Sequence, residues 1–582
     1  MTSRASVWQT AGVAALLAAS AGTAWAQDRP SEQDIFGGTA PKPAAPAQPT
    51  APAQPGAPAQ PPPSTTPPAP APDIVTGPPG ANQPGPGTPP AAATEDREAA
   101  RDTSVLGASG ETQHLSDYQA PDNPLQVGGQ VYLRTQSTAF QGGHPLFGQP
   151  QWALSAPSLL DLYLDARPNP RVRAFVLGRM SYDPTRASSA PTMPIGTTGG
   201  QGAFVGTSVT GFTTFSAGRG PNSLLDQMWI RFDVSQTVFV TAGKQHVRWG
   251  TGRFWQPTDY LHSLKRNPLD VFDARGGTSM LKLHVPWEDK GWNFYGVAVT
   301  EDPTDATASL TQVAGGGRAE IIILGAEVGI DALFKRYQKP RVGIDLSTGI
   351  GDFDVYADVG LRAGEDFNVV YKIPEGQVPT CQPPDPDPND GVTPMPIPQT
   401  TAAATYGVTQ LSGIKTQAVV GANYSRKYND NDMWTLGAEY FYNQPGYADT
   451  SLYPGLLANN TGVPQLNFFY TGRHYAALFL SLPAPYSWNY TTFNLSTIGN
   501  LSDLSFVSRL DYSVTVLTHL SFEAFAAVHY GTTSGEFRLG ANFAAQTGTN
   551  PAMPGSTDCF TFPAASYDPL LFDFGVALRM KI

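Results

Sequence analysis

The stretch Phe572-Asp573-Phe574-Gly575-Val576-Ala577-Leu578-Arg579-Met580-Lys581-Ile582 alternates without a fault between large apolar residues and small or charged ones. A period of two residues indicates a β-strand, whose successive side chains point to opposite faces. No turn follows this strand, so we expect it to pair with a neighbour on both edges. Its fully apolar face must meet a protein core or lipid tails. The pattern predicts the closing strand of a transmembrane β-barrel.

The same alternation recurs along the chain from Leu125 onward, and the connections between the alternating segments differ in length. Short connections follow Arg167, Val234 and Tyr428, whereas long connections rich in Gly, Ser, Thr and Pro fill 182–222, 250–277, 364–407, 443–471 and 531–568. A soluble β-sandwich also alternates, but it lacks this asymmetry of short and long connections. We therefore predict an all-β fold: a transmembrane antiparallel up-and-down β-barrel over residues 125–582 with about 18 strands (16 to 18). The clearest alternating segments are 160–164, 172–176, 228–232, 342–346, 353–361, 434–442, 506–514 and 520–530.

The N-terminal part of the sequence has a different composition. Arg4, a small apolar run and the site Ala24-Trp25-Ala26 predict a signal peptide over residues 1–26, cleaved after Ala26. Residues 27–124 include a long Pro/Ala-rich stretch that cannot bury enough apolar surface to fold. We expect this segment to be a disordered periplasmic tether. Its candidate partners are a periplasmic protein and peptidoglycan. The predicted location of the barrel is the bacterial outer membrane.

The overall composition narrows the function classes. Only 14% of the 582 residues are charged and 11% are aromatic, against about 25% charged in a typical soluble domain. The net charge of -12, without a basic stripe, argues against nucleic acid as a partner. After the signal peptide we find no apolar run of roughly 20 residues, so any membrane crossing must use strands. No metal or cofactor motif stands out, and Cys381 and Cys559 are candidates for one disulfide bridge.

The polar rows of the strands supply the candidate functional residues. If the apolar rows face lipid, the polar rows face the lumen and line a channel that about 16 to 18 strands leave wide enough for water. Both signs of charge occur, so the rows by themselves select neither cations nor anions. The alternative is that these charges pair across neighbouring strands inside a solvated or plugged lumen. The predicted pore-lining residues on these rows are Arg134, Asp161, Asp165, Arg173, Arg231, Asp233, Asp358, Arg362, Arg509 and Asp511.

The segment 243–259 is the densest cluster of functional residue types. Lys244 continues the row of Val240 and Ala242, and Gly243 is a candidate for a bulge that changes which side faces the lumen. In the loop that follows, Arg253, Trp255 and Asp259 are the candidate constriction residues. The alternative is a surface loop that packs on the rim. Farther on, Asn267-Pro268-Leu269-Asp270 predicts a short helix with Asn267 as its cap.

This stretch carries a family resemblance. The Gly-Lys-Gln strand at 243–245, Trp-Gly at 249–250, a Phe-x-x-Pro motif at 254–257, Asn-Pro-Leu-Asp at 267–270 and a new strand at 280–285 are together similar to porin-like outer-membrane β-barrels related to the alginate-export type. The resemblance implies a large barrel for the diffusion or export of polar solutes. It also implies that Lys244, Gln245, Arg248 and Trp249 lie on or near the channel wall. The final residue, Ile582, and the Pro-rich tether both depart from the usual pattern of such barrels.

The sequence favours a porin-like channel, not an enzyme, with outer-membrane lipid and small polar or charged solutes as partners. Two other functions stay open. The barrel could anchor or scaffold the envelope through the tether, or act as an outer-membrane hydrolase. The hydrolase is disfavoured because neither a Gly-x-Ser-x-Gly elbow nor a His-Glu-x-x-His pair occurs, and the histidines, His246 and His529 among them, are scattered singly.

Overall fold

A computed structural model describes most of the region after residue 123. The described ranges are 124–141, 152–169, 171–185, 221–262, 265–273, 275–300, 313–336, 338–385, 393–428, 432–457, 468–486, 488–549, 557–562 and 564–582. The expected signal peptide and nearly all of the expected tether lie outside these ranges. None of the helices within them combines the length and the apolar character that a membrane crossing by a helix requires.

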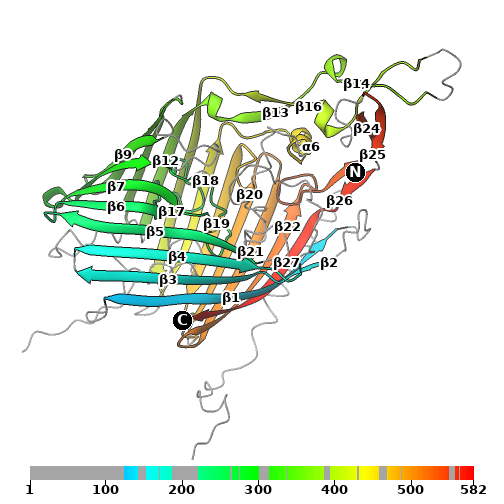
Figure 1. The fold of residues 1–582 in the computed structure, drawn as a ribbon. Helices are drawn as coiled ribbons and strands as arrows, with labels where there is room; N and C mark the ends of the chain where they lie inside the picture. The colour runs from blue at the N-terminus through cyan, green and yellow to red at the C-terminus, as the bar shows by residue number, and fades with distance from the viewer. Residues whose placement is uncertain are drawn as a thin grey trace, which may run out of the picture. The chain divides into compact units, whose positions relative to one another are not determined.

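The chain forms a closed antiparallel β-barrel (Figure 1). One sheet contains 19 strands. β2 and β3 pair with successive parts of β1, so together they fill one strand position of the barrel, interrupted at Ala156 and Pro157. We call each such strand position a stave. The barrel therefore has 18 staves, which confirms the predicted fold class and strand number. Its strands are β1 (Leu125–Phe140), β2 (Trp152–Ser155), β3 (Ser158–Asn169), β4 (Val172–Tyr182), β5 (Asn222–Val234), β6 (Val238–Gln245), β7 (Thr278–Trp287), β8 (Trp292–Val299), β9 (Ala314–Ile323), β10 (Ala326–Lys335), β11 (Arg341–Ile350), β12 (Phe353–Ala363), β17 (Ile414–Lys427), β18 (Met433–Asn443), β19 (His474–Pro483), β20 (Thr491–Asn500), β21 (Ser505–Leu517), β22 (Leu520–Gly531) and β27 (Leu570–Lys581).

The last strand closes the barrel, as its sequence predicts. β27 pairs with β22 on one edge and with β1 on the other, where Leu578 lies opposite Leu133. Every backbone group in this part of the ladder therefore has a partner, which a lipid environment demands.

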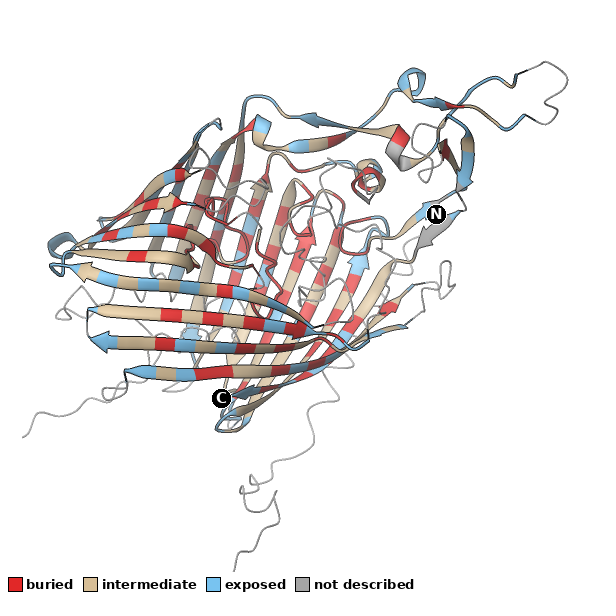
Figure 2. Cartoon of the chain, in the orientation of Figure 1, coloured by how far each residue is buried: buried red, intermediate tan, exposed pale blue. Residues whose placement is uncertain are grey.

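The alternation in the sequence becomes an alternation of exposure (Figure 2). On β27, Phe574, Val576, Leu578 and Met580 are 44–47% exposed on the outside of the barrel. Asp573, Ala577 and Arg579, at most 5% exposed, lie on the inner row. This strand thus presents its large apolar side chains outward and its charged ones inward, the reverse of a strand in a soluble protein.

Connection length separates the two ends of the barrel. At one end, the short-turn end, two-residue turns such as 324–325, 351–352 and 518–519 join the strands. At the other, the long-loop end, the long connections predicted from the sequence emerge. Two connections at the long-loop end are nevertheless short, 336–340 and 501–504.

The long connections carry the remaining elements except η2, which lies in the short connection between β7 and β8. Two pairs of short strands, β13 with β16 and β14 with β15, lie in 364–413, and two more, β23 with β26 and β24 with β25, lie in 532–569. Cys381 and Cys559 form a disulfide bond between these two connections. The elements are η2 (Glu288–Lys290), η4 (Gly364–Asp366), β13 (Asn368–Lys372), η5 (Glu375–Gln377), β14 (Thr380–Cys381), β15 (Ile397–Pro398), α5 (Ala402–Thr405), β16 (Tyr406–Gln410), η6 (Thr450–Leu452), α6 (Tyr453–Leu457), β23 (Ala541–Phe543), β24 (Gln546–Thr549), β25 (Cys559–Phe562) and β26 (Ala565–Tyr567).

Candidate channel and its inner loop

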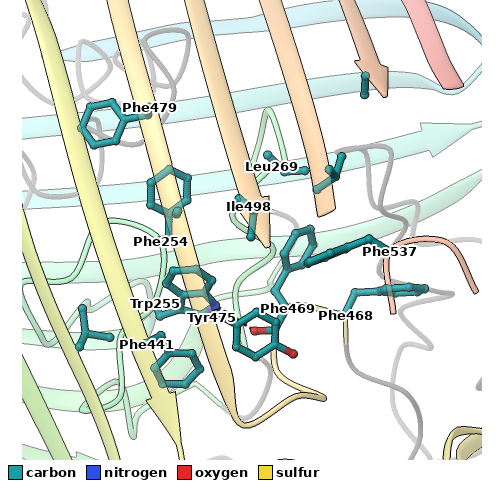
Figure 3. Packing of buried hydrophobic residues seen from close by; sticks show 14 of the residues in the cluster. Phe254, Trp255, Leu269, Phe441, Phe468, Phe469, Tyr475, Phe479, Ile498 and Phe537 are labelled. Atoms are coloured by element: carbon teal, nitrogen blue, oxygen red, sulfur yellow. Dashed lines mark hydrogen bonds between the residues drawn. The ribbon is translucent and has the colours of Figure 1, made fainter. Parts of the chain in front are cut away.

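The connection between β6 and β7, residues 246–277, folds into the barrel, and we call it the inner loop. Its aromatic residues are among the most buried of the molecule: Trp249, Phe254 and Trp255 have no exposed surface. Phe254 and Trp255 pack with side chains from the wall, such as Phe441, Tyr475 and Phe479, in an apolar cluster inside the barrel (Figure 3). A long polar loop would remain in water, whereas these aromatics supply the apolar area that keeps the inner loop inside.

One wall carboxylate anchors the inner loop. The backbone N–H groups of Arg253, Phe254 and Trp255 donate to the carboxylate of Glu439 on β18, at 2.7, 3.0 and 2.9 Å. The hydroxyl of Tyr356 on β12 donates to the same carboxylate at 2.8 Å. Consecutive amides that converge on one anion form a strong binding site because each hydrogen bond is charge-assisted.

A second contact joins the inner loop to β10–β12, where glycines leave room for it. The Thr258 hydroxyl donates to Asp358 at 3.3 Å, and the Tyr260 hydroxyl donates to the carbonyl of Val342 at 2.8 Å. A Cβ atom at Gly343 would lie 2.4 Å from the Thr258 methyl group and 2.6 Å from a carboxylate oxygen of Asp331. Only glycine lets the loop approach this part of the wall.

A third contact joins the inner loop to β21, at residues 267–270. The short helix expected for these residues is absent. Asn267 closes a single turn: its side-chain oxygen accepts from the Leu269 amide at 3.0 Å, and its carbonyl accepts from the Asp270 amide at 3.2 Å. The Leu269 carbonyl, which a helix would use internally, accepts from the Arg509 guanidinium of β21 at 3.2 Å. The prediction of a helix was wrong because the wall takes this backbone acceptor.

Ion pairs stiffen the inner loop internally. Arg275 pairs with Asp259 at 2.7 Å and with Asp273 at 2.6 Å, and His262 lies 3.1 Å from Asp259. Although burial alone would raise the pKa of Asp259, the charges of His262 and Arg275 hold this pKa below its ordinary value. Asp259 therefore stays ionised inside the barrel and joins the middle of the inner loop to its C-terminal part.

The structure places most of the predicted pore-lining residues on the inner rows. Many of them form ion pairs across neighbouring strands, for example Arg179 with Asp161 at 2.8 Å and Arg173 with Asp165 at 2.9 Å. The predicted wall residues that lie on inner rows are Arg134, Asp161, Asp165, Arg173, Arg231, Asp233, Gln245, Asp358, Arg362, Arg509 and Asp511.

Two predicted wall residues lie elsewhere. β6 keeps its register with β5 through Gly243, which has a φ of 127° and faces Trp229, so no bulge changes the sides. Lys244 therefore lies opposite Met228 on the outward row. Arg248 belongs to the inner loop and not to a strand, and its guanidinium donates to the Gly252 carbonyl at 2.7 Å.

The three predicted constriction residues all lie in the inner loop, where Trp255 and Asp259 are buried and Arg253 is partly exposed. The Arg253 guanidinium stacks on the ring of Phe479 at 3.5 Å from its centroid. The Trp255 indole N–H donates to the carbonyl of Phe469 at 2.9 Å. Together with Asp259 they span the inner loop from the wall at β18–β19 to its internal ion pairs.

The inner wall is charged differently on opposite sides. On β9–β12, four carboxylates surround one guanidinium: Arg318 pairs with Glu320, Asp331 and Asp345, and Asp358 lies directly opposite Asp345. About half-way around the barrel, on β1, β21 and β27, Arg134, Arg509 and Arg579 gather near the rings of Phe525 and Phe272. Among the described residues the guanidinium groups here outnumber the carboxylates that pair with them, which are Asp511, at 2.6 Å from Arg509, and Glu523, at 2.8 Å from Arg579. A field across the lumen follows from this separation.

The two histidines that a hydrolase could use are occupied by structural contacts. His529 contacts the carbonyl of Phe537 with one ring nitrogen and Asp573 with the other, both at 2.8 Å. His246 contacts Asp226 at 2.9 Å and stacks on His262.

The important residues that the sequence analysis did not single out are Glu439, Arg318, Asp331 and Glu536. Glu439 stands on the polar row of an alternating segment, which is the one available signal for it. Glu536 lies in a long loop, where no periodicity exists. Its contacts depend on the meeting of three loops.

No protein-family model and no curated protein matches the chain. Among solved structures, it is similar to a BenF-like porin from Pseudomonas fluorescens Pf-5, with 10% identity, a TM-score of 0.40, and coverage of 79% of this chain and 98% of that one. It is also similar to Pseudomonas aeruginosa OccK5 (OpdH), with 8% identity, a TM-score of 0.39 and the same coverage. A triple mutant of the Rhodopseudomonas blastica porin matches with 11% identity, a TM-score of 0.34, and coverage of 79% and 100%. At these scores the similarity does not identify a shared function.

Proposed function

We propose that this chain is an outer-membrane channel that lets small polar or charged solutes pass by diffusion or export. The observation that carries the proposal is the inverted distribution of polarity: the closed barrel turns apolar side chains outward and charged ones inward. Outward apolar rows suit contact with acyl chains, and an inward charged wall holds water. The inner loop lies across this lumen and sets the aperture.

The finer parts of the proposal concern the N-terminal segment and the family. Residues 1–26 act as a signal peptide cleaved after Ala26, and residues 27–124 form a periplasmic tether for a periplasmic protein or peptidoglycan. The barrel is related to porin-like proteins of the alginate-export type. It works without an enzymatic reaction, a cofactor or a metal.

Planar-bilayer conductance of the purified protein tests the proposal, with and without residues 27–124. Discrete conductance steps in both proteins support a channel. Membranes that stay closed with both proteins contradict it and favour an anchoring role. Steps that appear only after truncation show that the N-terminal segment blocks the channel.

A further inference from the structure

A cavity of about 650 Å³ lies between three connections at the long-loop end, and we call it the outer cavity. It is formed by residues of 400–406, of 450–454 around α6, and of 533–546. None of its lining residues is charged, in contrast to the wall of the lumen. Its volume falls within the range of small-molecule sites, about 300–1,000 Å³.

Hydrogen bonds between the connections hold the outer cavity in shape. The Thr400 amide donates to the Thr547 carbonyl, and the Thr547 amide donates to the Thr400 hydroxyl, both at 2.7 Å. The Tyr406 hydroxyl donates to the carbonyl of Ser451 at 2.8 Å. The disulfide between Cys381 and Cys559 joins two of the same connections. The cavity is therefore formed before any ligand arrives, which lowers the entropic cost of binding.

The lining offers hydrogen-bonding groups that the described part of the chain does not use. The side chains of Thr450, Thr533, Ser534, Asn542 and Gln546 make no hydrogen bond to other described residues. Three of them are hydroxyl groups and two are amides, so each can both donate and accept.

This chemistry excludes two classes of ligand. An ionic ligand would find no opposite charge among the lining residues. An apolar ligand would bury the five polar side chains without partners, at a cost for each. A ligand with many neutral hydroxyl groups matches the lining, because every sugar hydroxyl both donates and accepts.

We propose that the outer cavity is a binding site for a short neutral saccharide. Asn542 and Gln546 are the main recognition residues because an amide can form paired hydrogen bonds with neighbouring hydroxyls. The threonine and serine hydroxyls complete the site. The binding does not depend on conduction through the barrel.

Isothermal titration calorimetry on the full mature protein in lipid nanodiscs tests this site with maltotriose and raffinose as neutral probes and trigalacturonate as a charged one. Measurable binding of a neutral probe, tighter than that of trigalacturonate, is the expected result. The double variant Asn542→Leu/Gln546→Leu should weaken it by at least about tenfold, since both amides lose their hydrogen bonds to the ligand. Gln377→Leu, which removes an exposed amide outside the cavity, should leave it unchanged.

Three results would overturn the site: no binding of either neutral probe, binding as strong for trigalacturonate, or neutral binding that the double variant leaves intact. Heat-modifiable gel mobility shows whether the variants are folded. If the double variant is not, Thr533→Val takes its place, because it removes one hydroxyl at nearly constant shape. Its expected weakening is about fivefold, and an unchanged affinity contradicts the proposal.

Discussion

At the scale of single residues, the position of the inner loop depends on Glu439. Its carboxylate is 3% exposed and accepts four hydrogen bonds, three of them from consecutive amides. An anion so placed is satisfied only while residues 253–255 stay where they are. Burial of the aromatic cluster stabilises the inner loop, but apolar burial is not directional. The directional hydrogen bonds to Glu439 fix the position of the loop against β18.

We therefore expect Glu439→Gln to loosen the inner loop while the barrel stays intact. The amide retains one acceptor oxygen and presents an NH2 group to backbone donors, so the anchoring should weaken by about 2 kcal/mol. Single-channel recordings should show larger conductance and more frequent fluctuations, and liposome swelling should show a higher size limit for sugars. Tyr356→Phe, which removes one of the four donors, should have a smaller effect in the same direction. Wild-type recordings from Glu439→Gln would show that this residue does not control the aperture.

A second buried carboxylate, Glu536, links three connections at the long-loop end. It accepts from Tyr475 at 2.6 Å and from Asn500 at 2.8 Å, while its own amide donates to Asp503 at 2.8 Å. Burial, together with the charge of Asp503, raises the pKa of Glu536 from 4.5 to about 8 although Tyr475 acts in the opposite direction. The folded loops thus bind a proton that the opened loops release at neutral pH.

The sign of the resulting pH dependence follows from linkage. Because the folded form holds the proton more tightly, local stability is highest below about pH 4.5 and falls as the pH rises toward 8, by at most about 1.4 kcal/mol per unit. Hydrogen exchange of the segment 532–540, corrected for intrinsic rates, should therefore accelerate between pH 5 and 8. Glu536→Gln should remove this dependence. An equally steep dependence in that variant would assign it to another group.

Sequence reasoning reached some of these residues and missed others for physical reasons. Periodicity places Glu439 on an inner row, but nothing near it shows that a loop 186 residues earlier brings three amides to it. Lys244 was misplaced because Gly243 suggested a bulge, whereas a glycine with positive φ can keep the strand in register. The roles of such residues depend on contacts between segments that are distant in sequence. A local sequence pattern contains no information about those contacts.

At the scale of elements, the strands were the most predictable part of the molecule. Each inner-row residue must avoid lipid and each outer-row residue must face it, so the membrane imposes the two-residue period on every stave. The interruption between β2 and β3 escaped prediction because Pro157 removes one ladder donor inside a stave and leaves the pairing with β1 on both sides intact. Loops have no such constraint, which is why the expected helix at Asn267 was wrong.

The outward row of β27 allows a direct test of its contact with lipid. Val576 is 47% exposed in the middle of the strand, opposite Thr135 and Ala524. We expect Val576→Arg to lower the free energy of unfolding in vesicles by about 2–4 kcal/mol, because a charge at the bilayer centre is poorly solvated. Reversible guanidinium unfolding measures this loss, with Val576→Leu as the nearly neutral control. An arginine tolerated as well as leucine would mean that this row does not face acyl chains.

At the scale of the whole molecule, the barrel brings together charges that are distant in sequence. The acidic group on β9–β12 comes from the middle of the barrel sequence. The basic group on β1, β21 and β27 comes from its two ends, which only the closure of the barrel brings together. Solutes that pass beside the inner loop must cross the field between them. This arrangement favours orientation of dipolar solutes over strong selection by charge.

Removing a positive and a negative charge from the wall should then shift the ion selectivity of the channel in opposite directions. Arg231 and Asp511 lie on inner rows and are partly exposed to the lumen, so removing either charge changes the potential that a passing ion meets. A charge about 10 Å away in water contributes roughly 0.4 kcal/mol, which corresponds to about a twofold change in permeability ratio. In a potassium chloride gradient, Arg231→Gln should shift the reversal potential toward cation selectivity and Asp511→Asn toward anion selectivity. Lys339→Gln removes an exposed positive charge from the connection 336–340, outside the wall, and should leave the potential nearly unchanged. A shift from Lys339→Gln as large as that from Arg231→Gln would mean that net charge controls selectivity. No shift from Arg231→Gln or from Asp511→Asn would place their side chains away from the path of the ions.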